Sequence, residues 1–276
     1  MKRARIMANS TMASRSFWSV TNQLVKKCSP SVHGRLKRAV QGRQWPMPKL
    51  LMGHVVWAHP RVATQRVTEK HVLRWISERL QPGGVFVDVG AHCGWMSLEA
   101  ARVVGPGGTV VAFEPAPPLI EILDYHKRVN DVRQVRIVGK AVAERDAASV
   151  TLSIEGDGLG TGHSLTRGAA DARFARKTTS VQVESARLDT YCETSGLHPT
   201  VVKIDVEGAE RMVLEGSQQM LKRCHPRLIL AVHPPWLARG QSAQELFALL
   251  KNLEYRLEDS RVTPFEGHEF GDYLFA

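Results

Sequence analysis

The stretch from Val85 to Ser97, VFVDVGAHCGWMS, combines an acid with two glycines at the end of an apolar run. Asp88, Gly90 and Gly94 have the spacing DxGxxxG, and a turn of this kind between a buried strand and a helix is typical of nucleotide-binding loops. The dinucleotide fingerprint GxGxxG lets the backbone approach a pyrophosphate closely. This loop has one glycine in its tight turn, and its acid would repel a pyrophosphate but suits a cationic ligand.

A second acid, Glu114, ends the next predicted strand, 24 residues after Gly90. A carboxylate at this place can accept hydrogen bonds from the 2′- and 3′-hydroxyls of a ribose. NAD sites share that feature, so Asp88 and the shorter glycine pattern decide between the ligands. They favour S-adenosylmethionine, which carries an ammonium and a sulfonium but no phosphate. An NAD site and a glycine-rich turn without a ligand are the two alternatives.

Three carboxylates follow one another closely in KIDVEGAE, residues 203–210. Strand alternation places Lys203 and Asp205 on one face, so we expect Asp205 beside the cofactor loop. Glu207 would lie at the turn and Glu210 on the first turn of the next helix. The three acids could position an acceptor, hold a divalent cation or complement the helix N-terminus. A divalent cation is thus possible, but no metal-binding pattern supports it.

His233 ends a later predicted strand, and the ordinary pKa of histidine suits a general base. A hydrogen-bonded structural histidine before two prolines is the equal alternative. We predict that Asp205 and His233 form the acid–base and acceptor-orienting pair, with Glu207 next to them.

Two further residues follow from short motifs. HPPW, residues 233–236, is similar to the motif with which amino-methyltransferases bind a nucleobase nitrogen. Here the motif begins with His, and it follows the fifth strand and not the fourth. We interpret it as a loop turn, with Trp236 lining the acceptor pocket. His163 could reach the acceptor if its loop folds over the site, although a solvent-exposed histidine is the simpler interpretation.

The elements that must position these residues alternate regularly from residue 68 onward. Such alternation predicts a mostly parallel sheet with helices on both faces. The segment 155–179 is Gly-rich and polar, and we predict a loop or lid there. The predicted strands are 85–90, 109–115, 135–142, 149–154, 180–185, 200–208 and 227–233, with a closing hairpin of 255–260 and 272–276; the predicted helices are 68–80, 95–104, 117–130, 187–196, 209–224 and 242–253.

Charge is distributed unevenly along the 276 residues. Of 37 basic and 27 acidic residues, thirteen basic and no acidic ones lie in 1–68, which leaves 24 basic and 27 acidic residues for the rest. We therefore divide the chain into a basic N-terminal arm and packing segment, 1–67, and a folded domain, 68–276. The arm is interpreted as a poorly ordered leader; contact with an anionic membrane or nucleic acid, and a transit peptide, are the alternatives.

The composition indicates a globular protein and argues against a membrane span and against a zinc or redox site. Hydrophobic residues make up 43% of the chain and charged residues 23%, as in globular proteins, and no apolar run approaches the ~18–20 residues of a membrane span. The four cysteines, Cys28, Cys93, Cys192 and Cys224, form no CxxC pair. A zinc or redox site is therefore not expected, and free thiols favour a cytoplasmic location.

These motifs together resemble those of the FkbM-type methyltransferases, a class I family that uses S-adenosylmethionine. The similarity covers roughly residues 68–260 and rests on FVDVGAHCGWMS, VVAFEPAPPLIEIL, GKAVAERD and above all VVKIDVEGAERMVLEGSQQML. It implies an α/β, Rossmann-like fold with a mostly parallel seven-stranded sheet whose last strand is antiparallel. It also implies methyl transfer, usually to an oxygen, and many relatives act on sugar hydroxyls or secondary metabolites.

The resemblance assigns cofactor positions residue by residue. Those that match the family motifs are Asp88, Gly90, His92, Gly94, Ser97, Glu114, Ala141 and Val142. Asp88, Gly90 and Gly94 would form the loop near the methionine part, with Ser97 at the start of the following helix. Glu114 would hold the ribose, and Ala141 and Val142 would lie near the adenine. Two positions depart from the pattern: His92 replaces the usual Asn, and Ala231 stands where the fifth strand often carries an acid.

The sequence thus predicts an O-methyltransferase acting on a small-molecule or glycan acceptor. A nucleic-acid methyltransferase is an alternative, but the arm has few aromatics and the chain lacks a catalytic-cysteine motif of the 5-methylcytosine type. A cofactor-binding scaffold with weakened activity is another, because Ala231 removes an acid. Nucleic acid is an unlikely partner on these grounds, a peripheral membrane contact through the arm is possible, and the acceptor and oligomeric state are left open.

Overall fold

The structure is a computed structural model that describes residues 45–160, 163–165, 178–237, 241–265 and 268–276. The chain divides into two compact units, Met1–Arg66 and Val67–Ala276. Residues 1–44 of the predicted basic arm, and most of the predicted lid, lie outside the described residues. Within the described ranges, no helix combines the length and the apolar character needed to cross a membrane.

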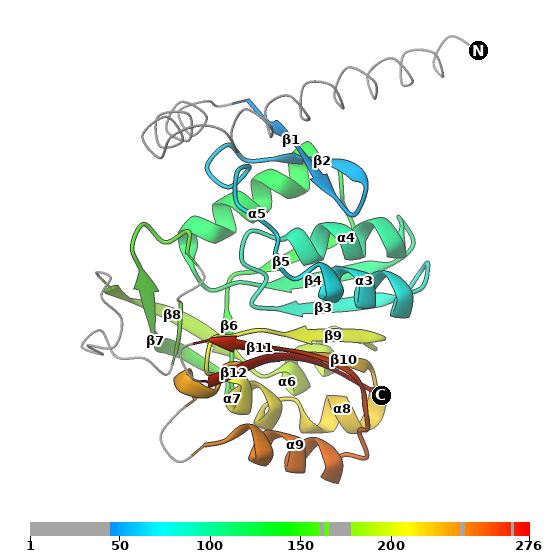
Figure 1. Cartoon of the computed structure of the whole chain (residues 1–276), viewed down its shortest axis with the longest axis vertical. Coiled ribbons are helices and arrows are strands. Elements are labelled where there is room, and N and C mark those ends of the chain that lie inside the picture. The colour runs from blue at the N-terminus through cyan, green and yellow to red at the C-terminus, as the bar shows by residue number, and fades with distance from the viewer. Residues whose placement is uncertain (1–44, 161–162, 166–177, 238–240, 266–267) are drawn as a thin grey trace. The chain divides into compact units, whose positions relative to one another are not determined.

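A seven-stranded sheet organises the second unit, in the order β11-β12-β10-β9-β3-β4-β5 (Figure 1). The strands from β10 to β5 are parallel, whereas β12 runs antiparallel to β10 and to β11. This confirms the predicted fold class. The strands are β3 (Val85–Val89), β4 (Thr109–Phe113), β5 (Val135–Val138), β9 (Val201–Ile204), β10 (Arg227–Val232), β11 (Leu257–Phe265) and β12 (His268–Phe275).

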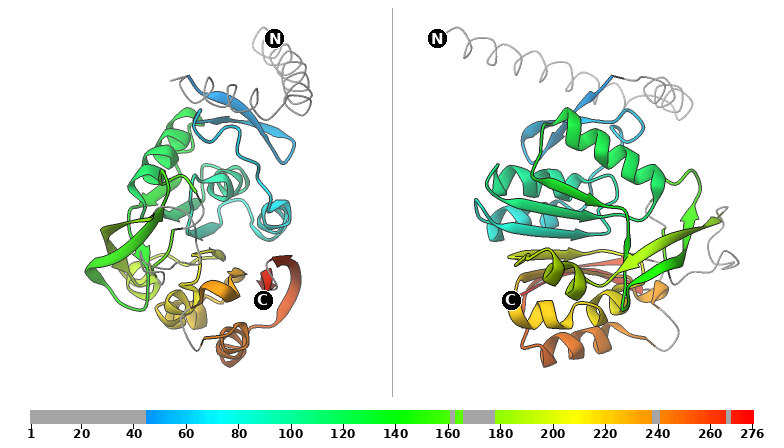
Figure 2. Two further views of the ribbon diagram at one scale, coloured as in Figure 1. Left: turned by 60° about the vertical axis from the view of Figure 1, so that its left-hand side comes forward. Right: turned by 180° about the vertical axis from the view of Figure 1, so that it is seen from behind.

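Helices cover both faces of this sheet, α3 to α5 on one side and α6 to α9 on the other (Figures 1 and 2). The central strands are buried along nearly their whole length, which explains why their sequences are apolar runs and do not alternate. The helices are α3 (Lys70–Arg79), α4 (Trp95–Val104), α5 (Pro117–Val129), α6 (Leu188–Thr194), α7 (Glu210–Glu215), α8 (Gln218–Cys224) and α9 (Ala243–Asn252).

The strand order reverses between β3 and β9. The chain moves from β3 outward to β4 and β5, and later from β9 outward to β10 in the opposite direction. The loops after β3 and β9 therefore diverge at the carboxyl ends of two neighbouring strands, where open α/β sheets bind their ligands. Both loops carry candidate site residues.

Two predicted elements are divided in the structure. The predicted strand 135–142 ends at Val138, and after Gly139 the chain leaves the main sheet as β6 (Ala141–Val142). β6 pairs with β8 (Thr178–Ala186), which also pairs with β7 (Ala147–Glu155). A turn hydrogen bond from Lys140 N to Val138 O, 2.9 Å, accompanies the break. The change of sheet brings β6 to the carboxyl ends of the main strands.

The predicted helix 209–224 is likewise interrupted, at Gly216. The carbonyl oxygen of Gly216 accepts the N–H of Asp189, and Ser217 Oγ donates back to Val213 O, 2.8 Å. The Gly216 backbone lies so close to Ala143 that a Cβ at this position would meet the carbonyl oxygen of Ala143 at 2.0 Å. The helix therefore splits into α7 and α8, and the contact joins this face of the sheet to the segment after β6.

We predict that Gly216→Ala lowers the free energy of unfolding by at least about 2 kcal/mol, because the added methyl group overlaps backbone and no flexible side chain can yield. Gly107→Ala is the matched control, since nothing lies within 4 Å of its Cβ position; it should change stability by less than about 0.5 kcal/mol. Denaturant unfolding of both variants measures the difference, and equal midpoints would contradict this account of the break.

Candidate functional site

Two glycines shape the loop between β3 and α4. Gly90 has φ +76° and Gly94 φ +89°, in the left-handed region that side chains avoid. A Cβ on Gly90 would lie 1.9 Å from the carbonyl oxygen of Asp205, and one on Gly94 would lie 2.2 Å from the side chain of Leu123. The glycines therefore let this loop lie directly against the end of β9 and against α5.

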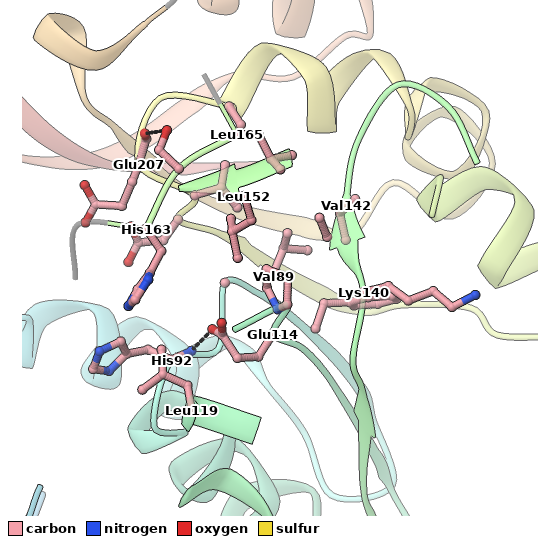
Figure 3. A pocket seen from close by; sticks show the side chains of 18 residues that line it. Val89, His92, Glu114, Leu119, Lys140, Val142, Leu152, His163, Leu165 and Glu207 are labelled. Atoms are coloured by element: carbon pink, nitrogen blue, oxygen red, sulfur yellow. Dashed lines mark hydrogen bonds between the residues drawn. The ribbon is translucent and has the colours of Figure 1, made fainter. Parts of the chain in front are cut away.

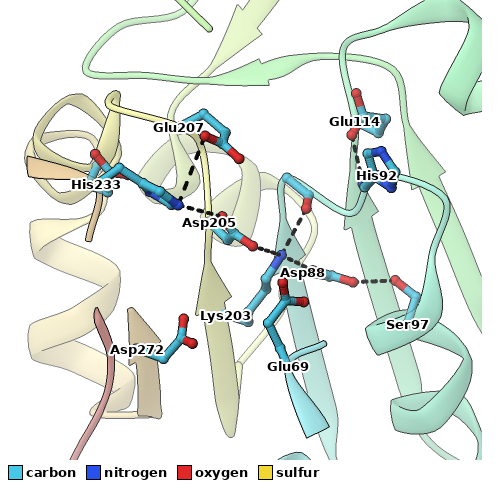
Figure 4. Close-up of polar contacts among 12 residues, drawn as sticks. Glu69, Asp88, His92, Ser97, Glu114, Lys203, Asp205, Glu207, His233 and Asp272 are labelled. Atoms are coloured by element: carbon cyan, nitrogen blue, oxygen red, sulfur yellow. Dashed lines mark hydrogen bonds and ion pairs between the residues drawn. The ribbon is translucent and has the colours of Figure 1, made fainter. Parts of the chain in front are cut away.

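Asp88 lies beneath this loop, fully buried on β3 (Figure 4). Ser97 Oγ donates a hydrogen bond to its Oδ2 at 2.6 Å, and Lys203 Nζ lies 3.4 Å from its Oδ1. Neither Asp88 nor Ser97 lines the pockets found among the described residues. Asp88, expected in the loop near the methionine part of a cofactor, and Ser97, expected at the start of the helix, thus join β3 to α4 beneath the loop.

Lys203 on β9 is the cation at the centre of the site. Its Nζ donates to the carbonyl oxygen of Gly90 at 2.8 Å and lies 3.3 Å from Asp205 Oδ2 as well as close to Asp88. Burial lowers the pKa of Lys203, but the charges of Asp205, Asp88 and Glu69 outweigh burial and raise it above its usual value. Sequence analysis placed Lys203 on the same face as Asp205 but assigned it no function. The feature that could have indicated one is a lysine within a strand that is buried on both sides.

Glu114 follows β4 and lies against the same loop (Figure 3). Its Oε2 accepts the N–H of His92 at 2.7 Å and its Oε1 that of Ala116 at 2.9 Å. Burial raises the pKa of Glu114 to about 7, against the lowering effect of these two hydrogen bonds. Each oxygen keeps a further lone pair, so the carboxylate can accept additional donors from a ligand.

The pocket beside Glu114, hereafter the Glu114 pocket, is mostly apolar (Figure 3). Ala141 and Val142 on β6 form part of its wall, as their predicted place near an adenine requires. His92 turns both ring nitrogens to protein atoms, with Nε2 3.1 Å from Gly160 O, and its ring borders the pocket. The side chains and backbone that line it include Val89, Gly90, His92, Phe113, Glu114, Leu119, Ala141, Val142, Leu152, His163, Asp205 and Glu207.

The described piece 163–165 forms one side of the Glu114 pocket. His163 lines this pocket and is half-buried, so it is not a fully solvent-exposed histidine, and it is not among the residues that line the second pocket described below. Ser164 Oγ donates to the backbone oxygen of Glu207 at 2.8 Å, and its backbone pairs with Ser153 on β7. The segment is therefore attached to the turn after β9.

His233, at the end of β10, faces the predicted acids (Figure 4). Its Nδ1 lies 2.7 Å from Oε1 of the buried Glu210, while its Nε2 lies 3.7 Å from Asp205 Oδ1 and 4.0 Å from Glu207 Oε2. Burial lowers the pKa of His233, but the hydrogen bond to Glu210 and the charges of Glu207, Glu210 and Asp205 raise it to about 10. The ring is therefore an imidazolium at neutral pH, and an imidazolium cannot accept a proton.

Asp205, Glu207 and His233 could also hold a divalent cation. One ligand atom from each lies within 4.8 Å of the other two, and Glu210 on Nδ1 would orient the ring as carboxylates do in metal sites. Two positive charges already compensate these acids, however: Lys203 beside Asp205 and the imidazolium itself.

A second and wider pocket, hereafter the Phe270 pocket, opens on the other side of Asp205. Phe270 packs edge-on against the ring of His233, with centroids 5.7 Å apart. Trp236, predicted to line the acceptor pocket, stacks on His233 at 5.1 Å and 11°, and it is not one of the residues that line the Phe270 pocket. Those residues include Thr68, Glu69, His71, Gly90, His92, Trp95, Lys203, Asp205, Glu207, Ala231, His233, Arg261, Phe270 and Asp272.

Sequence reasoning missed the acids that come from outside the motifs. Glu69, just before α3, points toward Lys203, and burial together with the charges of Asp205 and Asp272 raises its pKa (Figure 4). Asp272 on β12 lies 2.7 Å from His71 Nε2. No local pattern could have indicated these residues, because only the packing of α3 and β12 on the central strands brings them here.

Ala231 occupies the position at which the family resemblance leads us to expect an acid. It lines the Phe270 pocket and pairs in register with Asp272 across β10 and β12. Residues opposite each other in an antiparallel pair point to the same face of the sheet. A carboxylate from the neighbouring strand therefore lies beside the position where the family acid is missing.

Comparison with known proteins adds independent findings. A Beauveria bassiana (strain ARSEF 2860) protein called Methyltransferase 1 is 29% identical over 143 residues, which are 47% of this chain and 57% of that protein. The crystal structure of methyltransferase FkbM from Methylobacillus flagellatus KT is 15% identical with a TM-score of 0.45, over 74% of this chain and 51% of that one. A precorrin-6y C5,15-methyltransferase from Geobacter metallireducens GS-15 is also 15% identical, with a TM-score of 0.43, over 77% and 89%.

The chain thus spans between half and three-fifths of the fungal protein and of the M. flagellatus structure. A family model, the methyltransferase FkbM domain, matches residues 88–257, more than half of the chain. That range contains the glycine loop, Glu114 and the KIDVEG turn. The chain belongs to the FkbM methyltransferase family.

Proposed function

We propose that the protein is an S-adenosylmethionine-dependent methyltransferase that methylates a hydroxyl group of a sugar, glycan or secondary metabolite. One observation carries the proposal: Gly90, His92, Asp205 and Glu207 line both pockets. A cofactor with its adenosine in the Glu114 pocket would extend its methionine part along these residues into the Phe270 pocket, where it would meet the acceptor. Methyl transfer needs such an alignment of two reactants across a short distance.

The Glu114 pocket has the chemistry of an adenosine site. Glu114 can accept the two ribose hydroxyls, while the apolar side chains of Leu119, Val142 and Leu152 suit the faces of an adenine. Among the described residues that line the pocket, Lys140 is the one lysine or arginine, so this part of the lining offers little positive charge for a phosphate. S-adenosylmethionine fits this set of groups better than a dinucleotide does.

Glu69 is the residue that we assign to the methionine ammonium. Asp88, the acid expected in the loop near the methionine part, already pairs with Ser97 and Lys203. Glu69 lines the Phe270 pocket together with the loop residues Gly90 and His92. Burial raises the pKa of Glu69, so a cationic partner would stabilise its charged form.

The Phe270 pocket suits a hydroxylated acceptor. An aromatic ring offers an apolar face for the C–H groups of a sugar, and Asp205 and Glu207 can accept hydrogen bonds from hydroxyl groups. Asp272 supplies a further carboxylate beside Ala231. The pocket therefore keeps its acidic lining despite the missing family acid, which favours an active enzyme over a weakened scaffold.

Bound S-adenosylmethionine would supply an electrophilic methyl group on a sulfonium. Asp205 would accept the hydroxyl proton of the acceptor as its oxygen forms the new bond, since the acidity of that hydroxyl rises while the bond forms. Lys203 and His233 lower the pKa of Asp205 against the raising effect of burial, so it is a carboxylate at neutral pH. The His233 imidazolium would orient Asp205 and Glu207 from behind, with Glu210 fixing its ring.

We expect Glu114 to make cofactor affinity depend on pH. Ribose hydroxyls donate to the carboxylate, so binding favours its ionised form, and the pKa of about 7 leaves it partly protonated in the free protein. The Kd for S-adenosylhomocysteine should rise up to about tenfold per pH unit below 7. Calorimetry between pH 5.5 and about 8 tests this. In Glu114→Gln the pH dependence of this Kd should vanish, and binding at pH 8 should weaken. If the pH dependence persists in the variant, Glu114 does not bind the ribose.

We expect Asp205→Asn to lower kcat by about 10²-fold or more, because an amide cannot accept the hydroxyl proton. The Kd for S-adenosylhomocysteine should change by less than about tenfold, since the main cofactor contacts stay in place. Asp124→Asn, on the exposed face of α5, is the control and should leave both values unchanged. Full turnover in Asp205→Asn would transfer the role of proton acceptor to Glu207.

The assignment of Glu69 has a selective test. Glu69→Gln should weaken S-adenosylhomocysteine binding about tenfold, because the ammonium loses its ionic partner. Binding of 5′-methylthioadenosine, which has the adenosine but no amino-acid part, should not change. Glu78→Gln, an exposed site on α3, is the control. Equal weakening for both ligands would make Glu69 a structural residue, and unchanged binding of both would remove it from the cofactor site.

A further inference from the structure

The first unit presents a β-hairpin with a strongly apolar exposed side. β1 (Met47–Leu51) and β2 (His54–Ala58) pair antiparallel around a two-residue turn, Met52 and Gly53. The exposed large hydrophobic residues here are Trp45 at 80%, Leu50 at 61%, Trp57 at 44%, Met52 at 43% and Val55 at 42%. Of the seven such residues in the described chain, five therefore fall within this short segment.

The register of the hairpin gathers these side chains on one face. Leu50 is paired with Val55, and Pro48 with Trp57, so neighbouring positions along each strand alternate between an exposed face and a buried one. We call the four exposed residues Leu50, Met52, Val55 and Trp57, together with the half-buried Pro48, the hairpin face. Exposed apolar patches of this kind mark interaction sites, because removing apolar surface from water is favourable in free energy.

The only charged side chain of the hairpin strands is turned away from this face. Lys49 is buried, and its ammonium donates to the carbonyl oxygens of Ala63 and Gln65. Its pairing partner Val56 is buried as well. The hairpin face therefore has no charge of its own, and an apolar partner can lie against it without desolvating an ion.

The charge of the surrounding sequence indicates the chemistry of that partner. Residues 1–68 carry thirteen basic residues and no acidic one, whereas the remaining chain has 24 basic and 27 acidic residues. An anionic surface would therefore attract this part of the molecule and not the rest. A nucleic acid offers phosphates but no apolar layer for the hairpin face, whereas an anionic membrane offers both.

We propose that the hairpin face docks on an anionic membrane surface, with Trp57 and Leu50 entering the boundary between headgroups and acyl chains. Tryptophan favours this boundary, because its ring has an apolar body and a polar N–H. One weak apolar contact and a basic segment together give the two signals that stable peripheral binding requires. The proposal does not depend on the proposed methyl transfer.

The test uses the full chain and sedimentation with lipid vesicles. Binding to vesicles of phosphatidylcholine with about 30% phosphatidylserine should exceed binding to pure phosphatidylcholine at least about tenfold, and should weaken as salt screens the basic residues. The double variant Leu50→Ser/Trp57→Ser should bind the mixed vesicles at least about tenfold less tightly. Leu257→Ser, at a residue 54% exposed on β11, is the matched control and should bind like the wild type.

Two readouts separate a docking defect from a folding defect. Both altered side chains are exposed, so the double variant should keep the melting temperature and the S-adenosylhomocysteine affinity of the wild type. Equal vesicle binding by the wild type and the double variant would overturn the proposal. Absence of vesicle binding by the wild type would also overturn it. If the double variant then differs from the wild type in oligomeric state, the hairpin face binds a second copy of this chain.

Discussion

The site depends on one buried ammonium. Lys203 joins the ends of β3 and β9 at the point where the sheet reverses its order, through Asp88, Asp205 and the carbonyl oxygen of Gly90. Two carboxylates this close would repel each other in a low dielectric, and burial of either alone would be costly. The lysine therefore permits two acids to exist side by side under and beside a loop that must stay close to the cofactor.

The sequence alone predicted the architecture well, because the central strands are apolar runs separated by helices with clear ends. The positions of Gly90 and Glu114 also followed from local spacing, and both lie at one pocket. Each of these features depends on a short segment that determines its own geometry. The breaks at Gly139 and Gly216 were missed, because they go with the pairing of β6 with β8 and with the contact of Gly216 with Ala143, which a pattern along the chain does not contain.

The charge states of the site were harder to predict for the same reason. His233 has the residue type of a general base, yet three carboxylates from the turn after β9 and from α7 keep it protonated. Asp88 has the residue type of a cation ligand, yet its cation is Lys203. In both cases the partner lies more than twenty residues away, so the role of the group depends on tertiary packing and not on its own motif.

The two pockets differ in where their residues come from along the chain. The glycine loop, Glu114, Asp205 and His233 lie within the range shared with the family, 88–257, whereas Glu69, His71, Phe270 and Asp272 lie before or after it. The candidate centre is thus built from segments within the family range, and much of the wall of the Phe270 pocket from segments outside it. If the Phe270 pocket holds the acceptor, as we propose, exchange of the β11–β12 hairpin would alter which molecule is recognised while Asp205 and Glu114 are left untouched, a division that allows one scaffold to diversify.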